Sequence, residues 1–298
     1  MLNSGTFDLI WIEKELLPWL PSAFENWLLG RNRVVLDLDD GWHLRYDCAP
    51  TNLQRRTFSG KIAALACRSD AVVIANKELG AWLQASGRKR GAELLPTVVD
   101  LQRYAVAPEP AGPFTLAWIG SPSTARYLKM MEPVLQRLRA EFPIRLVVIS
   151  DKANATMFKH PWMEFVEWSE KSEAAELERC HVGIAPTPDG IWERYKTGYK
   201  IIQYMAAGRA VVASAVGANR DIVVAGETGL FAGSAAEWYA ALKRLHDDPM
   251  LRHRMGEAGR RRCESTFSIN AVSDRLASIL LSAAAGQVGA QPGSDSGY

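Results

Sequence analysis

The chain has 298 residues, of which 35 are Lys or Arg and 33 are Asp or Glu, so its formal net charge is +2 at pH 7. At roughly 100 to 150 residues per domain, this length predicts two domains. The charges are interspersed, so no basic stripe of the kind that binds nucleic-acid phosphates is present, and we expect no nucleic-acid partner. No stretch approaches the ~20 apolar residues of a membrane span, and the start lacks a secretory pattern, which predicts a cytoplasmic protein.

Short runs rich in Val and Ile recur between longer segments of helical periodicity. They lie at residues 9–12, 34–38, 71–75, 114–119, 144–149, 182–186 and 210–214. Such runs suit strands that are buried on both faces, and helices between them imply that the strands are parallel. The predicted fold class is therefore α/β, with doubly wound parallel sheets.

Three prolines and one glycine lie within residues 106–113, so this segment can continue neither a helix nor a central strand. We place a domain boundary there, which gives a first domain at residues 1–106 and a second at residues 107–267. The segment 285–298 is polar and rich in Gly and Ser, and we expect it to be a disordered tail.

A predicted strand ends at Gly120 and is followed by small polar residues and a helical pattern. Glycine at a strand end lets the backbone approach an anion, and the free N–H groups of the next helix favour phosphate. Ser121, Ser123 and Thr124 add hydroxyl donors, and Arg126 adds a positive charge. An ordinary capped strand-turn-helix explains the same pattern, so both interpretations stay open.

A second candidate site precedes the predicted strand at residues 210–214. A charged loop containing glycine leads into a helix of about two and a half turns that Gly208 ends. On this helix Tyr199, Lys200 and Gln203 share one face, because they are three or four residues apart. Lys196 of the loop, Lys200 and Gln203 can therefore converge on one anionic ligand.

The segment 188–214 resembles the donor-binding segment of family 4 retaining glycosyltransferases, which have the GT-B fold of two Rossmann-like domains. The closest pattern reads P-x-D-x-x-W-E-x-G-K-x-G-Y/F-K-x-I-Q-Y-M-A-x-G. It is matched by Pro188, Trp192, Glu193, Lys196, Gly198, Tyr199, Lys200, Gln203, Tyr204, Met205, Ala206 and Gly208. Residues 95–100, 168–173 and 216–230 resemble further segments of the family. The family's last helix crosses back to the first domain, a role that the resemblance gives to residues 268–284.

The resemblance implies transfer of a sugar from a nucleotide-diphosphate donor to a saccharide or lipid-linked acceptor, with retained anomeric configuration. It implies no metal and no cofactor beyond the donor substrate. Negative charge on the leaving diphosphate would be stabilised by the helix after Gly120, by Arg126, and by Lys196 and Lys200. Gln203 would contact the ribose.

Two departures from the family pattern concern its paired glutamates, which have the spacing E-x7-E. Tyr195 and Gln203 occupy those positions here. A glutamine still hydrogen-bonds ribose hydroxyls, because it carries both a donor and an acceptor. Glu193 is a candidate to contact the donor sugar in place of the first glutamate, and backbone groups around Gly198 are the alternative.

A third candidate site lies at the end of the predicted strand at residues 34–38, where Asp37, Asp39 and Asp40 lie close together. The resemblance sets Asp39 or Asp40 against the donor sugar and acceptor. A metal-binding D-x-D motif, a phosphatase-type nucleophile and carboxylates that only cap a turn are the alternatives. Because the histidines and the four cysteines lack ligand spacing, we predict no metal site.

The opening strand at residues 5–12 resembles a middle strand of a GT-B domain. We therefore expect the first domain to lack its first part and to expose a sheet edge, unless a partner subunit completes it.

A second hypothesis follows, a non-catalytic GT-B protein that binds nucleotide sugar or pairs with an active subunit. Sugar-nucleotide epimerases and phosphorylases form a third. The basic helix at residues 252–262 is either a solvated face or a peripheral contact with the inner face of a membrane.

Overall fold

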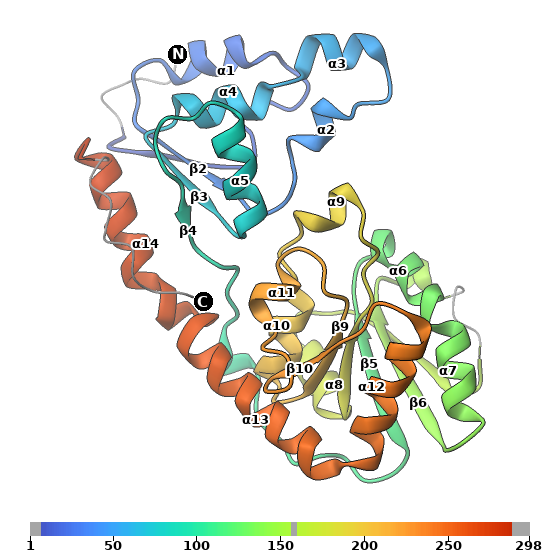
Figure 1. Cartoon of the computed structure of the whole chain (residues 1–298). Coiled ribbons are helices and arrows are strands. Elements are labelled where there is room, and N and C mark those ends of the chain that lie inside the picture. Colours follow the sequence, from blue (N-terminus) through green and yellow to red (C-terminus); the bar gives the residue numbers. More distant parts are fainter. Residues whose placement is uncertain (1–6, 156–159, 288–298) are drawn as a thin grey trace. The chain divides into compact units, whose positions relative to one another are not determined.

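The computed structural model describes residues 7–155 and 160–287 (Figure 1). The chain forms two compact units that are interleaved in sequence. The first comprises Met1–Thr97, Arg194–Thr197 and Val272–Tyr298, and the second comprises Val98–Glu193 and Gly198–Ala271. Each unit has its own parallel sheet and its own core, as the predicted α/β class requires.

The first unit contains a four-stranded sheet of order β1-β2-β3-β4. Its strands are β1 (Ile10–Glu13), β2 (Val34–Leu38), β3 (Ala71–Ile74) and β4 (Glu93–Leu94), all parallel. Its helices are α1 (Ser22–Leu29), α2 (Leu44–Asp47), α3 (Asn52–Phe58), α4 (Lys61–Arg68), α5 (Lys77–Ala85) and most of α14 (Ile269–Ala284).

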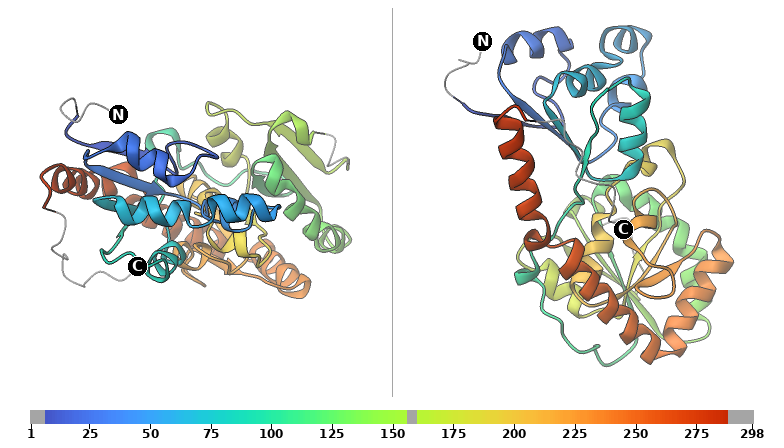
Figure 2. Two further views of the ribbon diagram at one scale, coloured as in Figure 1. Left: turned by 90° about the horizontal axis from the view of Figure 1, so that it is seen from above. Right: turned by 60° about the vertical axis from the view of Figure 1, so that its left-hand side comes forward.

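Alternate residues of each strand point to opposite sides of this sheet, and both sides are covered by apolar clusters. On one side, Leu36 and Val72 pack with Leu65 of α4 in the larger core. On the other side, Val35 and Ala71 pack with residues of α14. Figure 2 shows α14 running beside this sheet. The continuous Val and Ile runs seen in the sequence follow from this double burial.

The second unit contains a six-stranded parallel sheet of order β10-β9-β8-β5-β6-β7. Its strands are β5 (Phe114–Ile119), β6 (Ile144–Ser150), β7 (Met163–Glu167), β8 (Val182–Ala185), β9 (Ala210–Ala213) and β10 (Gly229–Phe231). Its helices are α6 (Pro122–Leu128), α7 (Glu132–Arg139), α8 (Glu173–Glu178), α9 (Ile191–Arg194, whose last residue joins the first unit), α10 (Tyr199–Ala206), α11 (Asn219–Ile222), α12 (Ala235–Asp247) and α13 (Pro249–Thr266). Three short 3₁₀ turns lie at Leu101–Arg103, Lys129–Met131 and Lys152–Asn154.

Helix α10 lies directly on this sheet because Gly183 of β8 leaves room for Tyr204. A Cβ atom on Gly183 would lie 2.1 Å from Cγ of the Tyr204 ring. Ile201, Ile202 and Met205 are buried on the same side. The seven strands predicted from apolar runs are all present, which confirms the α/β prediction, whereas β4, β7 and β10 were not predicted.

The segment after Thr97 packs on the second unit. The guanidinium of Arg252 pairs with Glu109 at 2.5 Å, and Nη2 of Arg209 donates to the Ala107 carbonyl oxygen at 3.0 Å. The sequence-based boundary at residue 106 stays a prediction, as do the assignments of 268–284 and 285–298, and residues 288–298 lie outside the described part of the chain.

Helix α13 contains the basic run at residues 252–262. Arg252 pairs with Glu109, and Arg260 and Arg262 donate to backbone carbonyl oxygens of the second unit. These three guanidinium groups therefore hold α13 in place. No helix among the described residues is both long and apolar enough to cross a membrane.

Candidate functional site

The order in which strands are added to the six-stranded sheet reverses between β5 and β8. Strands β6 and β7 extend the sheet on one side of β5, whereas β8 and β9 extend it on the other side. The ladder between β5 and β8 ends at Ala117 and Gly183. Beyond it, the Tyr204 hydroxyl accepts a hydrogen bond from Ile119 N at 3.0 Å and donates to the Ile184 carbonyl oxygen at 3.1 Å. Open α/β sheets bind ligands outside the carboxyl ends of their strands at such a switch point.

The turn after β5 begins at Gly120, where a side chain has no room. A Cβ atom there would lie 2.7 Å from the Trp118 ring and 2.8 Å from the Thr124 hydroxyl oxygen. The Thr124 hydroxyl donates to the Ser121 carbonyl oxygen at 3.0 Å. Ser121 is the N-cap of α6 without a side-chain cap, and its hydroxyl lies 3.0 Å from that of exposed Ser123. Two hydroxyl groups therefore remain at the surface of this turn.

Glu193, predicted to contact a donor sugar, is only 7% exposed and bonds within the protein. Its carboxylate accepts a short hydrogen bond from the Tyr127 hydroxyl, and Nη2 of Arg126 lies 3.7 Å from it. Burial, followed by the hydrogen bond to Glu193, raises the pKa of Tyr127. The positive charge of Arg126 thus offsets the negative charge of Glu193. The contacts of Glu193 with Arg126 and Tyr127 hold the loop after β8 against α6.

Helix α10 begins at Gly198, whose φ of +66° is in the left-handed region. A Cβ atom on Gly198 would lie 2.7 Å from Cδ1 of Ile222 and 2.8 Å from Oδ1 of Asn219, so only glycine fits. No side chain caps this helix. In its first turn, the Lys200 ammonium lies 4.6 Å from the centre of the Trp118 ring. Two helix N-termini without side-chain caps and one ammonium group therefore make the switch point electropositive.

Gln203 lies one turn further along α10 and is 4% exposed. Its Nε2 donates to Oε2 of Glu173 at 3.1 Å. Tyr199, on the same face of α10, is partly buried, and burial followed by the charge of Glu173 raises its pKa. Glu173 was not among the predicted site residues, although the segment 168–173 was singled out by its resemblance.

Three further side chains contact Glu173. Nε1 of Trp168 donates to it at 2.6 Å, Nη2 of Arg103 at 2.8 Å and the Tyr104 hydroxyl at 2.7 Å. The 3% exposure of Glu173 agrees with this enclosure. The carboxylate therefore anchors α8, α10 and the segment around Arg103 to one another.

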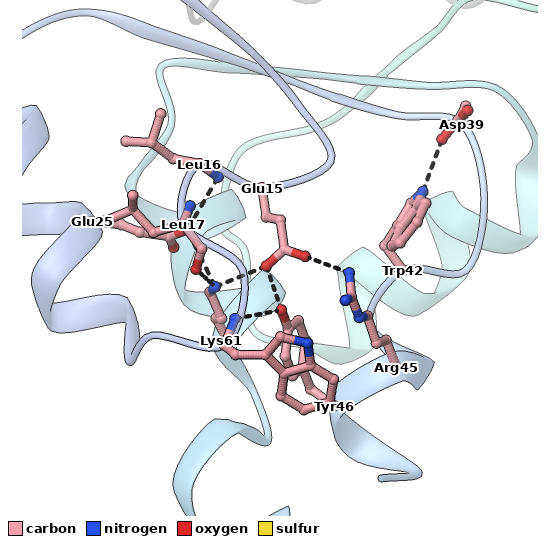
Figure 3. Close-up of polar contacts among 10 residues, drawn as sticks. Glu15, Leu16, Leu17, Glu25, Asp39, Trp42, Arg45, Tyr46 and Lys61 are labelled. Carbon is pink, nitrogen blue, oxygen red and sulfur yellow. Dashed lines mark hydrogen bonds and ion pairs between the residues drawn. The ribbon is translucent and has the colours of Figure 1, made fainter. Parts of the chain in front are cut away.

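In the first unit, Asp39 is held by two neighbours. Nε1 of Trp42 donates to Asp39 at 3.1 Å, and the Lys14 ammonium lies 3.4 Å from its other oxygen (Figure 3 shows the Trp42 contact). Burial, followed by the charges of Asp39 and Glu13, raises the pKa of Asp37 to about 6. The carboxylates at the end of β2 therefore repel one another, and Lys14 offsets part of that repulsion.

Asp40 faces the segment Arg194–Thr197, which belongs to the first unit. Burial, followed by the charge of Asp39, raises the pKa of Asp40, whereas Lys196 and a backbone hydrogen bond from Thr197 lower it. The structure thus brings together Asp40 and Lys196, two residues that the sequence singled out separately.

A buried charged network lies beside these carboxylates (Figure 3). The Lys61 ammonium lies 2.8 Å from Glu15 and 3.3 Å from Glu25. Tyr46 donates to Glu15, as does Nη1 of Arg45 at 3.1 Å. The guanidinium of Arg45 also lies over the Trp42 ring, 5.7 Å from its centre. The network therefore supports the residue that orients Asp39.

His43 lies in the same part of the first unit and is 4% exposed. Its ring stacks on Trp82 at 4.1 Å and meets the edge of Tyr195 at 4.6 Å, and among the described residues its Nδ1 has no partner. Burial lowers the pKa of His43 from 6.5 to about 4. Because the unfolded chain binds the proton more tightly, His43 costs stability as the pH falls from about 6.5 to 4.

Phenylalanine in a His43→Phe variant keeps the stacked ring but does not titrate. Between pH 7 and pH 5, we expect the unfolding free energy of this variant to fall by about 2 kcal/mol less than that of the wild type. Urea unfolding of both proteins at the two pH values measures this difference. The raised pKa of Asp37 acts in the opposite direction but is common to both proteins. Equal losses would show that His43 is not the acid-sensitive group.

Among residues 7–155 and 160–287, no group of three or more His, Cys, Asp or Glu side chains is arranged to hold a metal ion. Residues 114–248 match the family described as Glycosyl transferases group 1. No curated protein matches the chain.

Three solved structures illustrate the likeness of the fold. The chain is similar to HepE of Anabaena in complex with UDP and glucose, with a TM-score of 0.71 and 14% identity over 87% of this chain and 74% of that one. It is similar to sucrose-phosphate synthase of Thermosynechococcus elongatus, with a TM-score of 0.67 and 17% identity over 92% and 73%. It is also similar to a glycosyltransferase of Rickettsia africae, with a TM-score of 0.71 and 11% identity over 94% and 77%.

These comparisons agree with the two parallel sheets and with the position of the switch point inside the matched segment. The chain therefore has the GT-B fold, and its residues 114–248 match the glycosyl transferases group 1 family.

Proposed function

We propose that this chain transfers a sugar from a nucleoside-diphosphate donor to a saccharide or lipid-linked acceptor, with retention of configuration, as family 4 glycosyltransferases do. One observation carries the proposal. Gly120, Gly198, Lys200 and Gln203 follow the carboxyl ends of β5 and β8, at the switch point of the sheet and within the group 1 domain. Ligand sites of open α/β sheets lie at that position.

The diphosphate is proposed to bind between the turn at Gly120 and the start of α10. Backbone N–H groups at the first turns of α6 and α10 favour an anion there, and the Lys200 ammonium adds a full positive charge. The same groups stabilise the negative charge that develops on the diphosphate as its bond to the sugar breaks. The hydroxyl groups of Ser121 and Ser123 add donors at the surface of the turn.

The sugar and the acceptor hydroxyl are assigned to Asp40 and Lys196. Asp40 has a raised pKa and lies beside a cation, so its carboxyl group is suited to orienting hydroxyl groups by hydrogen bonds. Asp39 is already held by Trp42 and Lys14, and its proposed role is to keep a negative charge next to Asp40.

Calorimetric titration of the chain with UDP, GDP and ADP tests the donor site, and HepE makes UDP the first ligand to try. We expect one of the three to bind, followed by release of sugar from its sugar conjugate when an acceptor is supplied. Binding without sugar release would favour the non-catalytic nucleotide-sugar protein. A folded chain that binds no nucleoside diphosphate would contradict the proposal.

A further inference from the structure

We propose that Trp118 is a positioning residue that acts through Lys200: the face of its buried indole ring holds the Lys200 ammonium at the carboxyl end of β5, where the diphosphate of the donor binds. The inference rests on the proposed donor function. It assigns a role to a buried tryptophan that no step of that function has used.

The indole ring of Trp118 lies at the switch point of the six-stranded sheet. Trp118 is fully buried and stands one residue before the end of β5. Its six-membered ring fills the space beside Gly120, because a Cβ atom there would lie 2.7 Å from Cζ2 and 2.8 Å from Cη2 of that ring. The Lys200 ammonium lies over the indole, 4.6 Å from the ring centre. One ring therefore contacts both the turn after β5 and the first turn of α10.

The ammonium of Lys200 stands where the helix itself repels it. Lys200 is in the first turn of α10, which no side chain caps, and a helix N-terminus carries a positive partial charge. The face of an aromatic ring is negative and attracts a cation that lies within about 6 Å of the ring centre. Trp118 thus offsets the repulsion without a carboxylate, which would also repel the diphosphate.

The unpaired N–H group of Trp118 fits this role. Among residues 7–155 and 160–287, its Nε1 is a buried atom without a hydrogen-bond partner. An unpaired buried donor costs stability, and phenylalanine at this position would not carry one. Tryptophan, however, has the strongest cation–π attraction of the aromatic side chains. The orphaned N–H therefore accompanies the ring that holds Lys200 best.

Holding the ammonium in advance strengthens binding of an anion. A lysine side chain has a flexible four-carbon stem, and ordering it when a ligand binds costs entropy. An ammonium has three N–H donors, so it can rest on the ring with one side and donate to the diphosphate with the other. Because Trp118 restricts Lys200 before the ligand arrives, less entropy is lost on binding.

Fluorination of the Trp118 ring tests the inference, since fluorine atoms draw electron density from the ring face and change its shape little. Full chains with tryptophan that carries none to four fluorine atoms at position 118, inserted by stop-codon suppression, are titrated with UDP and with uridine. GDP and guanosine replace them if GDP is the nucleotide that binds. We expect the affinity for UDP to fall stepwise, by about 5- to 10-fold in total, and that for uridine to stay unchanged. Fluorination of Trp238, which is buried in the same core, is the matched control.

The same series in a Lys200→Ala background separates positioning from packing. If Trp118 acts through Lys200, its fluorination leaves the UDP affinity of Lys200→Ala unchanged, whereas an equal fall there would show a merely structural role and overturn the inference. UDP binding that stays unchanged or tightens when Trp118 is fluorinated in the wild type would also overturn it, while leaving the proposed function intact. A wild type that binds no nucleoside diphosphate would remove both.

Discussion

Replacing Lys61 with methionine is expected to lower the free energy of unfolding by about 3–5 kcal/mol, because it leaves buried Glu25 without its cation and Glu15 with Arg45 alone. Lys61 is 2% exposed and pairs with both Glu15 and Glu25. Among the described residues, Oε2 of Glu25 already lacks a partner, so this site has no spare donor. Urea unfolding followed by tryptophan fluorescence measures the loss.

Lys243→Met is the matched control for this substitution. Lys243 forms exposed ion pairs with Glu141 at 3.4 Å and Asp247 at 3.2 Å, and removing such pairs changes stability little because water screens them. Neutralising Glu15 and Glu25 with glutamine in the Lys61→Met background should restore much of the lost stability. A Lys61→Met protein within 1 kcal/mol of the wild type would mean that the network is solvated.

Replacing Lys200 with alanine is expected to weaken UDP binding by about 10- to 100-fold and to leave binding of uridine unchanged. Loss of a hydrogen bond to a charged partner costs about 1.5–3 kcal/mol, which corresponds to that range. Uridine lacks the phosphates, so the ammonium makes no difference to it. Parallel calorimetric titrations with the two ligands measure both affinities.

Two further variants complete this experiment. Lys200→Arg keeps the positive charge and should recover most of the affinity for UDP. Lys243→Ala removes a lysine from α12 of the same unit and should bind UDP as the wild type does. If Lys200→Ala weakened UDP and uridine equally, the phosphates would not lie at the start of α10.

The fold was predictable where strands are buried on both faces. The seven predicted strands include β3, β8 and β9, whose unbroken apolar runs have one explanation in an α/β chain. The three that were missed, β4, β7 and β10, are all at the ends of their sheets. Edge strands need no continuous apolar run, and Met163–Glu167 carries charges at Glu164 and Glu167, so the sequence carries only a weak signal there.

The candidate site was predictable where the signal is local. Gly198 and Lys200 follow from a loop and one helix turn, since their chemistry depends on neighbours in sequence. The partner of Gln203 could not be predicted, because Glu173 is 30 residues away and only the packing of α8 against α10 brings it close. Glu193 illustrates the same limit, since its partner Tyr127 is 66 residues away.

The interleaving of the two units sets the order in which they can form during synthesis. Every residue of the second unit precedes Val272, whereas the first unit needs Ile279 and Ala283 of α14 to cover Val35 on its sheet. Domains commonly fold in the order in which they leave the ribosome. Here the strands that are made first complete their core last, so the nascent chain carries an uncovered sheet face until α14 has emerged. A chaperone that binds apolar strands therefore has its longest opportunity at the strands of the first unit.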